Sequence, residues 1–188
     1  MNPRSLLCSL AIAALSLAIS PAALAAKSAS CAHCHGTDGN SSSPIYPNLA
    51  GQTKEYLYKQ IMAFKTGARV NAMMSSSVGI LTEDDAKELA EYFSAQPMAR
   101  NRFQTDPALA AQGKKLAAEV QCAACHQPGF KGLAEFPRVA RQKFQYIVKQ
   151  LKDYRDGVRT SDEGVMSATV KNFTDEQIDA LAHYITDL

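Results

Sequence analysis

Residues 31–35 have the sequence Cys-Ala-His-Cys-His, and residues 122–126 have the sequence Cys-Ala-Ala-Cys-His. This C-x-x-C-H spacing is typical of covalent attachment of a c-type haem. Two thiols one helical turn apart each form a thioether to the same porphyrin, and the adjacent histidine gives its imidazole Nε2 to the iron. Each half of the chain is small and rich in loops, so an apolar porphyrin would supply the core that it lacks.

The two C-x-x-C pairs also fit three other kinds of chemistry. A zinc ion held by four thiolates would leave the repeated histidine and methionine residues without a role. A thioredoxin-like redox motif needs a βαβ context, which the sequence does not contain. Two disulfides are possible in an exported protein, but they do not explain the histidine after each pair. Haem attachment is therefore favoured, because the full motif occurs twice within a longer repeat.

The similarity between the two halves extends well beyond the motifs and indicates a duplication. Residues 47–52 (PNLAGQ) match residues 137–142 (PRVARQ) at an offset of 90. The same offset pairs Tyr56 with Tyr146, Lys59-Gln60 with Lys149-Gln150, Gly67 with Gly157 and Arg69 with Arg159. After a short length difference the offset becomes 92, and it pairs Met74, Val78 and Thr82 with Met166, Val170 and Thr174.

The N-terminal segment has the features of a secretory signal. Arg4 precedes an apolar run from Leu6 to Ile19, and Ala23-Leu24-Ala25 is an A-x-A cleavage site. The run is shorter than the ~20 residues that span a bilayer, which disfavours an uncleaved anchor. Cleavage would also remove Cys8 and deliver the mature chain to a periplasm. The expected division is a signal peptide at 1–25, a first domain at 26–95, a linker at 96–106 and a second domain at 107–188.

The composition is that of a globular protein. The chain has 188 residues, of which 46% are hydrophobic and 20% are charged, and its formal net charge is +2. These values exclude a disordered chain and disfavour a nucleic-acid binder, which would carry a dominant basic field. Residues 131–159 do contain eight Lys or Arg against three Asp or Glu. This basic stretch is either a steering surface for an acidic partner or an ordinary solvated helix face.

Helices are expected throughout, because no segment shows sustained strand alternation. Thr53 is placed to cap a helix that ends near Gly67. Thr82 with Asp85, and Thr174 with Gln177, have the spacing of capping boxes. Asp106-Pro107 should begin another helix, with Leu109, Gly113, Leu116 and Val120 on one face. Glycine on that face predicts a close helix crossing.

A histidine-ligated haem iron needs a sixth ligand or an open site, and a thioether sulfur favours ferrous iron and raises the reduction potential. Each half has a methionine eight residues before the capping threonine, Met74 and Met166. Met73 remains an alternative to Met74. Met62 and Met98 are expected to be packing residues. Neither His33 nor His183 is expected to bind iron, and His183 is expected to be solvated.

The sequence resembles the dihaem cytochrome c4 family over nearly the whole mature chain. The resemblance is carried by residues 31–36, 38–40, 47–52 and 67–74 in the first half, and by residues 122–126, 137–140, 154–159 and 166 in the second. It implies an all-α protein of two tandem class I cytochrome c domains, each wrapped around a covalently attached haem. It also implies that the carbonyl groups of Pro47 and Pro137 accept a hydrogen bond from the iron-binding histidines.

Two haem c groups are therefore expected. The attachment residues would be Cys31, Cys34, Cys122 and Cys125, and the axial ligands would be His35 with Met74 and His126 with Met166. Arg69 and Arg159 would either pair with haem propionates or lie at the surface.

The expected function is outer-sphere electron transfer without substrate chemistry, because two saturated irons leave no open position. The resemblance implies a periplasmic carrier between redox proteins, with a quinol-oxidising complex as an example of the donor and a terminal oxidase as the acceptor. Any membrane association would come through these partners. One alternative is the haem subunit of a larger oxidoreductase, such as a flavocytochrome c sulfide dehydrogenase. Another is a dihaem peroxidase, which is disfavoured because it needs a displaceable ligand and each half supplies a methionine.

Overall fold

The computed structural model describes residues 21–160 and 162–188, and its regular elements there are helices. Most of the expected signal peptide lies outside the described residues. The first half contains α1 (Pro21–His35), α2 (Lys54–Thr66), α3 (Ala72–Val78) and α4 (Glu83–Ser94). The second half contains α5 (Pro107–Glu119), α6 (Ala123–His126), α7 (Phe144–Arg155), α8 (Val165–Val170) and α9 (Asp175–Asp187), with two short 3-10 turns at Pro128–Phe130 and Asp162–Gly164. The predicted all-α class is confirmed.

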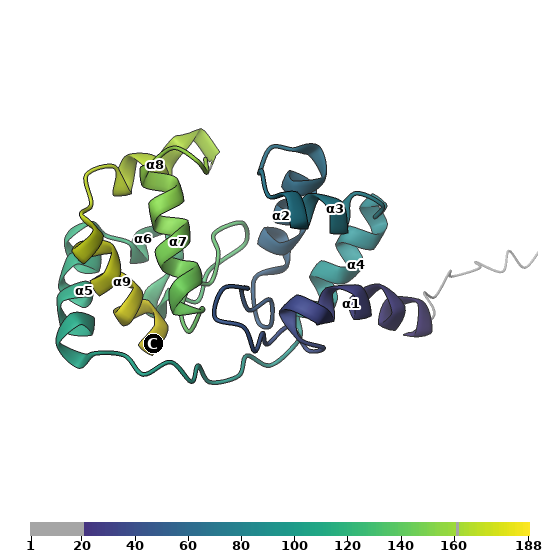
Figure 1. Cartoon of the computed structure of the whole chain (residues 1–188), viewed down its shortest axis with the longest axis horizontal. Coiled ribbons are helices and arrows are strands. Elements are labelled where there is room, and N and C mark those ends of the chain that lie inside the picture. Colours follow the sequence, from purple (N-terminus) through teal and green to yellow (C-terminus); the bar gives the residue numbers. More distant parts are fainter. Residues whose placement is uncertain (1–20, 161) are drawn as a thin grey trace, which may run out of the picture.

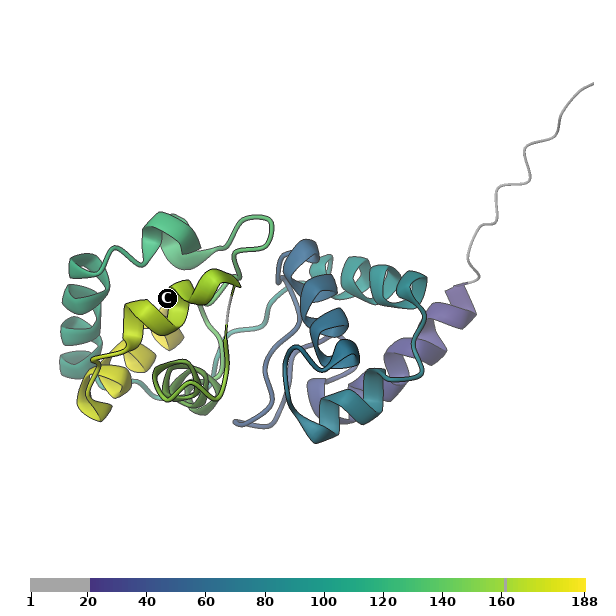
Figure 2. The same ribbon diagram turned by 90° about the horizontal axis from the view of Figure 1, so that it is seen from above.

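The helices form two separate groups. Helices α1 to α4 lie together at one end of the molecule and α5 to α9 at the other, and an extended segment joins them (Figures 1 and 2). Each group has its own apolar core. The first core contains Leu57, Leu89, Ala90 and Phe93. The second is larger and includes Ile147, Leu151, Val170, Ile178, Leu181 and Ile185. The helices that follow the two capping threonines, α4 and α9, both supply residues to these cores.

Helix capping follows the sequence at three of four sites. At one of them, Asp106 caps α5 by accepting hydrogen bonds from the backbone N–H groups of Ala108 and Leu109. Thr82 and Thr174 each form the predicted capping box, with Asp85 and Gln177 respectively. Thr53 occupies the N-cap position of α2, but its side chain makes no capping hydrogen bond and its Oγ1 is buried without a hydrogen-bond partner. The expected cap at Thr53 is therefore wrong in its chemistry although right in its position. The backbone N–H of Thr53 donates to Gln52 Oε1.

The close helix crossing predicted at Gly113 is present. A Cβ atom built on Gly113 would lie 2.0 Å from the carbonyl oxygen of Ala180 in α9, so no larger side chain fits without movement. The fully buried face of α5 consists of Ala110, Gly113 and Ala117. Leu109, Leu116 and Val120 are only half-buried, so the predicted face is rotated from the observed one. The small residues face α9 because its backbone approaches so closely.

In the first half, ion pairs join the first helix to the last. Lys27 of α1 forms ion pairs with Asp85 and Glu88 of α4. Cys31 packs, half-buried, against the first core. The predicted cleavage position after Ala25 lies inside α1, and it remains a prediction. Within the described residues, none of the helices combines the length and the apolarity needed to cross a membrane.

Candidate haem-binding site

The two motif histidines are held in the same way. The Nδ1 atom of His35 lies 2.9 Å from the carbonyl oxygen of Pro47, and the Nδ1 atom of His126 lies 2.9 Å from that of Pro137. Since a carbonyl can only accept, each ring donates its Nδ1–H and leaves Nε2 available as a ligand. Burial lowers the pKa of both imidazoles, which favours the neutral form that binds metals.

The four motif cysteines are half-buried, and none of them is joined to another in a disulfide. Cys31 and Cys34 lie in the last turns of α1, Cys125 lies in α6, and Cys122 is the residue before α6. Burial raises the pKa of the Cys31 and Cys122 thiols. Among the described residues, no three His, Cys, Asp or Glu side chains gather into a metal-binding group. The two thiol pairs are therefore not arranged as a four-thiolate zinc site would require.

The candidate methionines lie on the short helices α3 and α8. The backbone N–H of Met74 donates to Asn71 Oδ1 at the start of α3, and its side chain is half-buried. Met73, the alternative, is 53% exposed, and its sulfur accepts a hydrogen bond from the Tyr46 hydroxyl at 3.7 Å. Met166 is half-buried in α8 and packs against the second core. The greater burial of Met74 agrees with the choice that the repeat favours.

Arg69 and Arg159 meet at the boundary between the halves. Arg69 donates to Gln60, Tyr146 and Gln150 at 2.6, 3.1 and 2.7 Å. Arg159 donates to Gln150, Tyr56 and Gln60 at 2.6, 2.9 and 3.1 Å. Each guanidinium also lies over an aromatic ring, that of Phe64 or Tyr154, at 4.5 and 4.6 Å from the ring centre. Arg159 is only 8% exposed, so the surface alternative is wrong for this residue.

Two glutamines to which sequence analysis gave no role also join the halves. Gln52 and Gln142 are 6% and 5% exposed, and each hydrogen-bonds to the backbone of the opposite half. The only signal in the sequence is that they occupy matching positions at the ends of PNLAGQ and PRVARQ. A repeat marks such residues as equivalent, but it does not show that they reach across the boundary.

The two remaining histidines differ from each other. His33 is exposed, as expected of a residue that does not bind iron. His183 is 8% exposed, so the expectation of a solvated side chain is wrong. Its Nδ1 accepts a hydrogen bond of 2.9 Å from the backbone N–H of Asp106, and its ring contacts Phe103 and Phe144. His183 is a structural residue that ties the start of α5 to α9.

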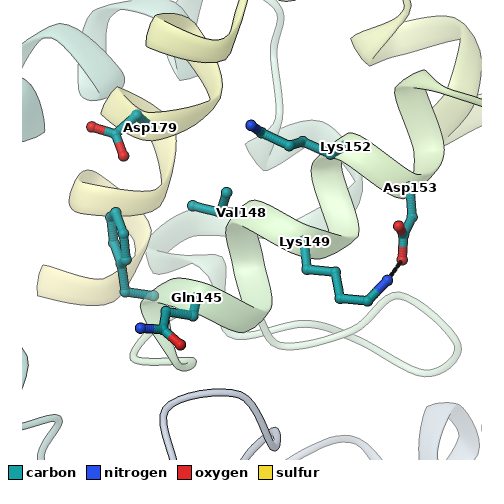
Figure 3. Close-up of a pocket in the computed structure, with 7 residues that line it drawn as sticks. Gln145, Val148, Lys149, Lys152, Asp153 and Asp179 are labelled. Atoms are coloured by element: carbon teal, nitrogen blue, oxygen red, sulfur yellow. Dashed lines mark hydrogen bonds and ion pairs between the residues drawn. The ribbon is translucent and has the colours of Figure 1, made fainter.

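In the basic stretch at residues 131–159, three side chains of α7 pair with carboxylates. Lys149 pairs with Asp153 at 2.5 Å, as Figure 3 shows on the outer side of α7. Lys152 pairs with Asp175, and Arg155 pairs with Asp156 and Asp175. A surface pocket beside these residues also contains Asp179, so its lining carries both signs of charge (Figure 3). These pairs favour an ordinary solvated face at Lys149, Lys152 and Arg155.

The residues present fit a haem in each half. Each half supplies a pair of thiols, an imidazole with Nδ1 already bonded, and a half-buried methionine. The Nε atoms of Arg138 and Arg159 are buried without a hydrogen-bond partner in the described residues. Buried donors of this kind need an acceptor, which the propionates of a haem can provide.

Comparison with known proteins agrees with this geometry. The family model for cytochrome c matches residues 22–96 and 110–188. Cytochrome c4 of Pseudomonas aeruginosa is 37% identical over 196 aligned positions, covering 98% of this chain and 96% of the relative. The crystal structure of reduced cytochrome c4 from Pseudomonas stutzeri has a TM-score of 0.83 and 36% identity, and it covers 90% of this chain and 98% of the other. A thiosulfate dehydrogenase electron acceptor of Thiomonas intermedia is 35% identical over 87% of this chain and 81% of the relative.

The fold and the duplicated site define a tandem c-type cytochrome with two covalently bound haem c groups. More narrowly, the chain belongs to the cytochrome c4 family of dihaem electron-transfer proteins.

Proposed function

We propose that both haems are six-coordinate, with His35 and Met74 on one iron and His126 and Met166 on the other. Cys31 and Cys34 would attach the first haem, and Cys122 and Cys125 the second. The observation that carries this proposal is the matching 2.9 Å contact between each motif histidine and a proline carbonyl. Such a contact fixes the ring and strengthens the imidazole as a donor.

The haem iron supplies one-electron chemistry between its ferric and ferrous states. The protein's part is to keep the iron environment the same in both states. The proline carbonyls hold the imidazole orientation, the half-buried methionines would bind the iron, and the cores would keep water away from it. Arg138 and Arg159 would donate to the propionates through their buried Nε atoms. With no open position for a substrate, the protein transfers electrons and does not act as an enzyme.

The axial ligands can be tested one at a time. Met74→Ala and Met166→Ala should each open one iron, so that the reduced holoprotein binds one equivalent of CO, while the wild type binds none. Met73→Ala is the matched control, because it removes the neighbouring exposed thioether and should leave CO binding at the wild-type level. If Met73→Ala opens the first haem and Met74→Ala does not, then Met73 is the ligand. CO binding by the wild type would refute saturated ligation.

We propose a periplasmic location, with export directed by residues 1–25 and cleavage near Ala25. The carrier would accept electrons from a protein such as a quinol-oxidising complex and pass them toward a terminal oxidase. The support is the signal-like sequence and the presence of two haems, which let an electron enter at one and leave at the other. Mass spectrometry of the exported protein should find a chain that starts near Ala26 and carries two haems.

A second candidate function is that of a fixed electron acceptor within an oxidoreductase complex. The likeness to the thiosulfate dehydrogenase electron acceptor of Thiomonas intermedia favours this reading. Purification from the native source distinguishes the two. A fixed subunit would be isolated at a constant ratio with a catalytic chain through several columns, whereas a free carrier would separate from every partner.

A further inference from the structure

Gln142 of the second half is hydrogen-bonded to the backbone of Asn48, the residue that follows Pro47 in the first half. Its Oε1 accepts a hydrogen bond of 2.7 Å from the backbone N–H of Asn48, and its Nε2 donates to the Asn48 carbonyl oxygen at 2.9 Å. Asn48 and Gln142 are 4% and 5% exposed. These hydrogen bonds are therefore shielded from water and from competition by solvent.

Gln52 makes the equivalent contact in the opposite direction, from the first half to the second. Its Oε1 accepts a hydrogen bond of 2.7 Å from the backbone N–H of Arg138, and its Nε2 donates to the Arg138 carbonyl oxygen at 2.8 Å. Asn48 and Arg138 are equivalent in the repeat, as are Gln52 and Gln142. The same bidentate contact is thus made in both directions across the domain boundary.

One peptide group connects each glutamine to a motif histidine. The carbonyl of Pro47 and the N–H of Asn48 belong to the same peptide bond. The carbonyl accepts the Nδ1–H of His35 at 2.9 Å, and the N–H donates to Gln142 at 2.7 Å. Donation from the N–H polarises the peptide and makes its carbonyl a stronger acceptor. The peptide between Pro137 and Arg138 connects His126 to Gln52 in the same way.

We propose that Gln142 and Gln52 are positioning residues that tune the iron ligand of the opposite domain. The inference rests on the proposed ligation by His35 and His126. A stronger acceptor at Nδ1–H gives the imidazole more anionic character, which stabilises ferric iron and lowers the reduction potential. Each glutamine therefore lowers the reduction potential of the haem in the other half of the chain.

The test is a pair of variants, Gln142→Met and Gln52→Met, in the holoprotein. Both keep the side-chain length and remove the amide. A redox titration followed by NMR reports each haem separately, through the protons of its own axial ligands. Gln142→Met should raise the potential of the haem bound by His35 and leave the other near its wild-type value. Gln52→Met should do the reverse. The Nδ1–H resonance of the affected histidine should also move, because its hydrogen bond weakens.

A second variant keeps the test open if the methionine variants fail to fold. Gln142→Glu retains an acceptor for the Asn48 N–H and makes it anionic, so the potential of the first haem should fall more than that of the second. Glu135→Gln serves as the control, because it breaks the 2.6 Å ion pair with Lys59 across the domain boundary. It leaves the Pro47–Asn48 and Pro137–Arg138 peptides unchanged. It should shift neither haem selectively.

Three results would overturn the inference: a shift confined to the haem in the glutamine's own half, an equal shift of both haems, or unchanged potentials. Failure of the proposed function would look different. In that case the wild-type NMR spectrum would show that His35 and His126 do not bind iron.

Discussion

The environment of His183 could not be predicted from its position in the sequence. A histidine late in an amphipathic helix suggests a solvated face, yet here it is buried and accepts a hydrogen bond from the backbone of Asp106. The partner lies 77 positions away in the sequence, so no local pattern could have indicated the contact. The C-x-x-C-H motifs lie at the other extreme, because their chemistry depends on residues within one helical turn.

His183→Leu should lower the free energy of unfolding by about 0.5–1.5 kcal/mol, because it removes the acceptor of the partly buried hydrogen bond from the Asp106 N–H. The measurement is denaturant unfolding of the holoprotein, followed by circular dichroism. His33→Leu is the matched control, since His33 is exposed and should change stability little. Equal losses in the two variants would contradict a structural role for His183.

Helices and their ends were predictable where the signals are local. The capping boxes at Thr82 and Thr174 formed as expected, and glycine at position 113 correctly indicated a close crossing. At Thr53 the residue type and position fit a cap, but the side-chain Oγ1 is buried without a hydrogen-bond partner. The face of α5 was misjudged because large apolar residues were taken to mark the core, whereas α9 admits only small ones.

Gly113→Ala should destabilise the second domain by about 1–3 kcal/mol, because the added methyl group overlaps the Ala180 carbonyl and forces α5 and α9 apart. Thermal unfolding of the holoprotein would show this as a lower transition temperature for the second domain. Gln112→Ala, on the exposed side of the same helix, should have little effect. If Gly113→Ala proved as stable as the wild type, the close crossing would be refuted.

Over the whole molecule, the duplication predicted the two domains and their equivalent residues but not how they meet. The contacts that cross the boundary join residues far apart in the sequence and arise only after folding. They are made by Gln52, Gln142, Arg69 and Arg159. Charge along the sequence was equally uninformative about the surface, because Lys152 and Arg155 of α7 pair with Asp175 of α9.

The central claim is that one chain holds two covalently attached haems, each bound by histidine and methionine. A redox titration of the purified holoprotein, followed by visible and NMR spectra, tests it most directly. We expect two haems per chain, two one-electron steps and, in the reduced protein, one axial methionine methyl signal from each haem. A high-spin ferric haem, or a single methionine signal, would contradict the account.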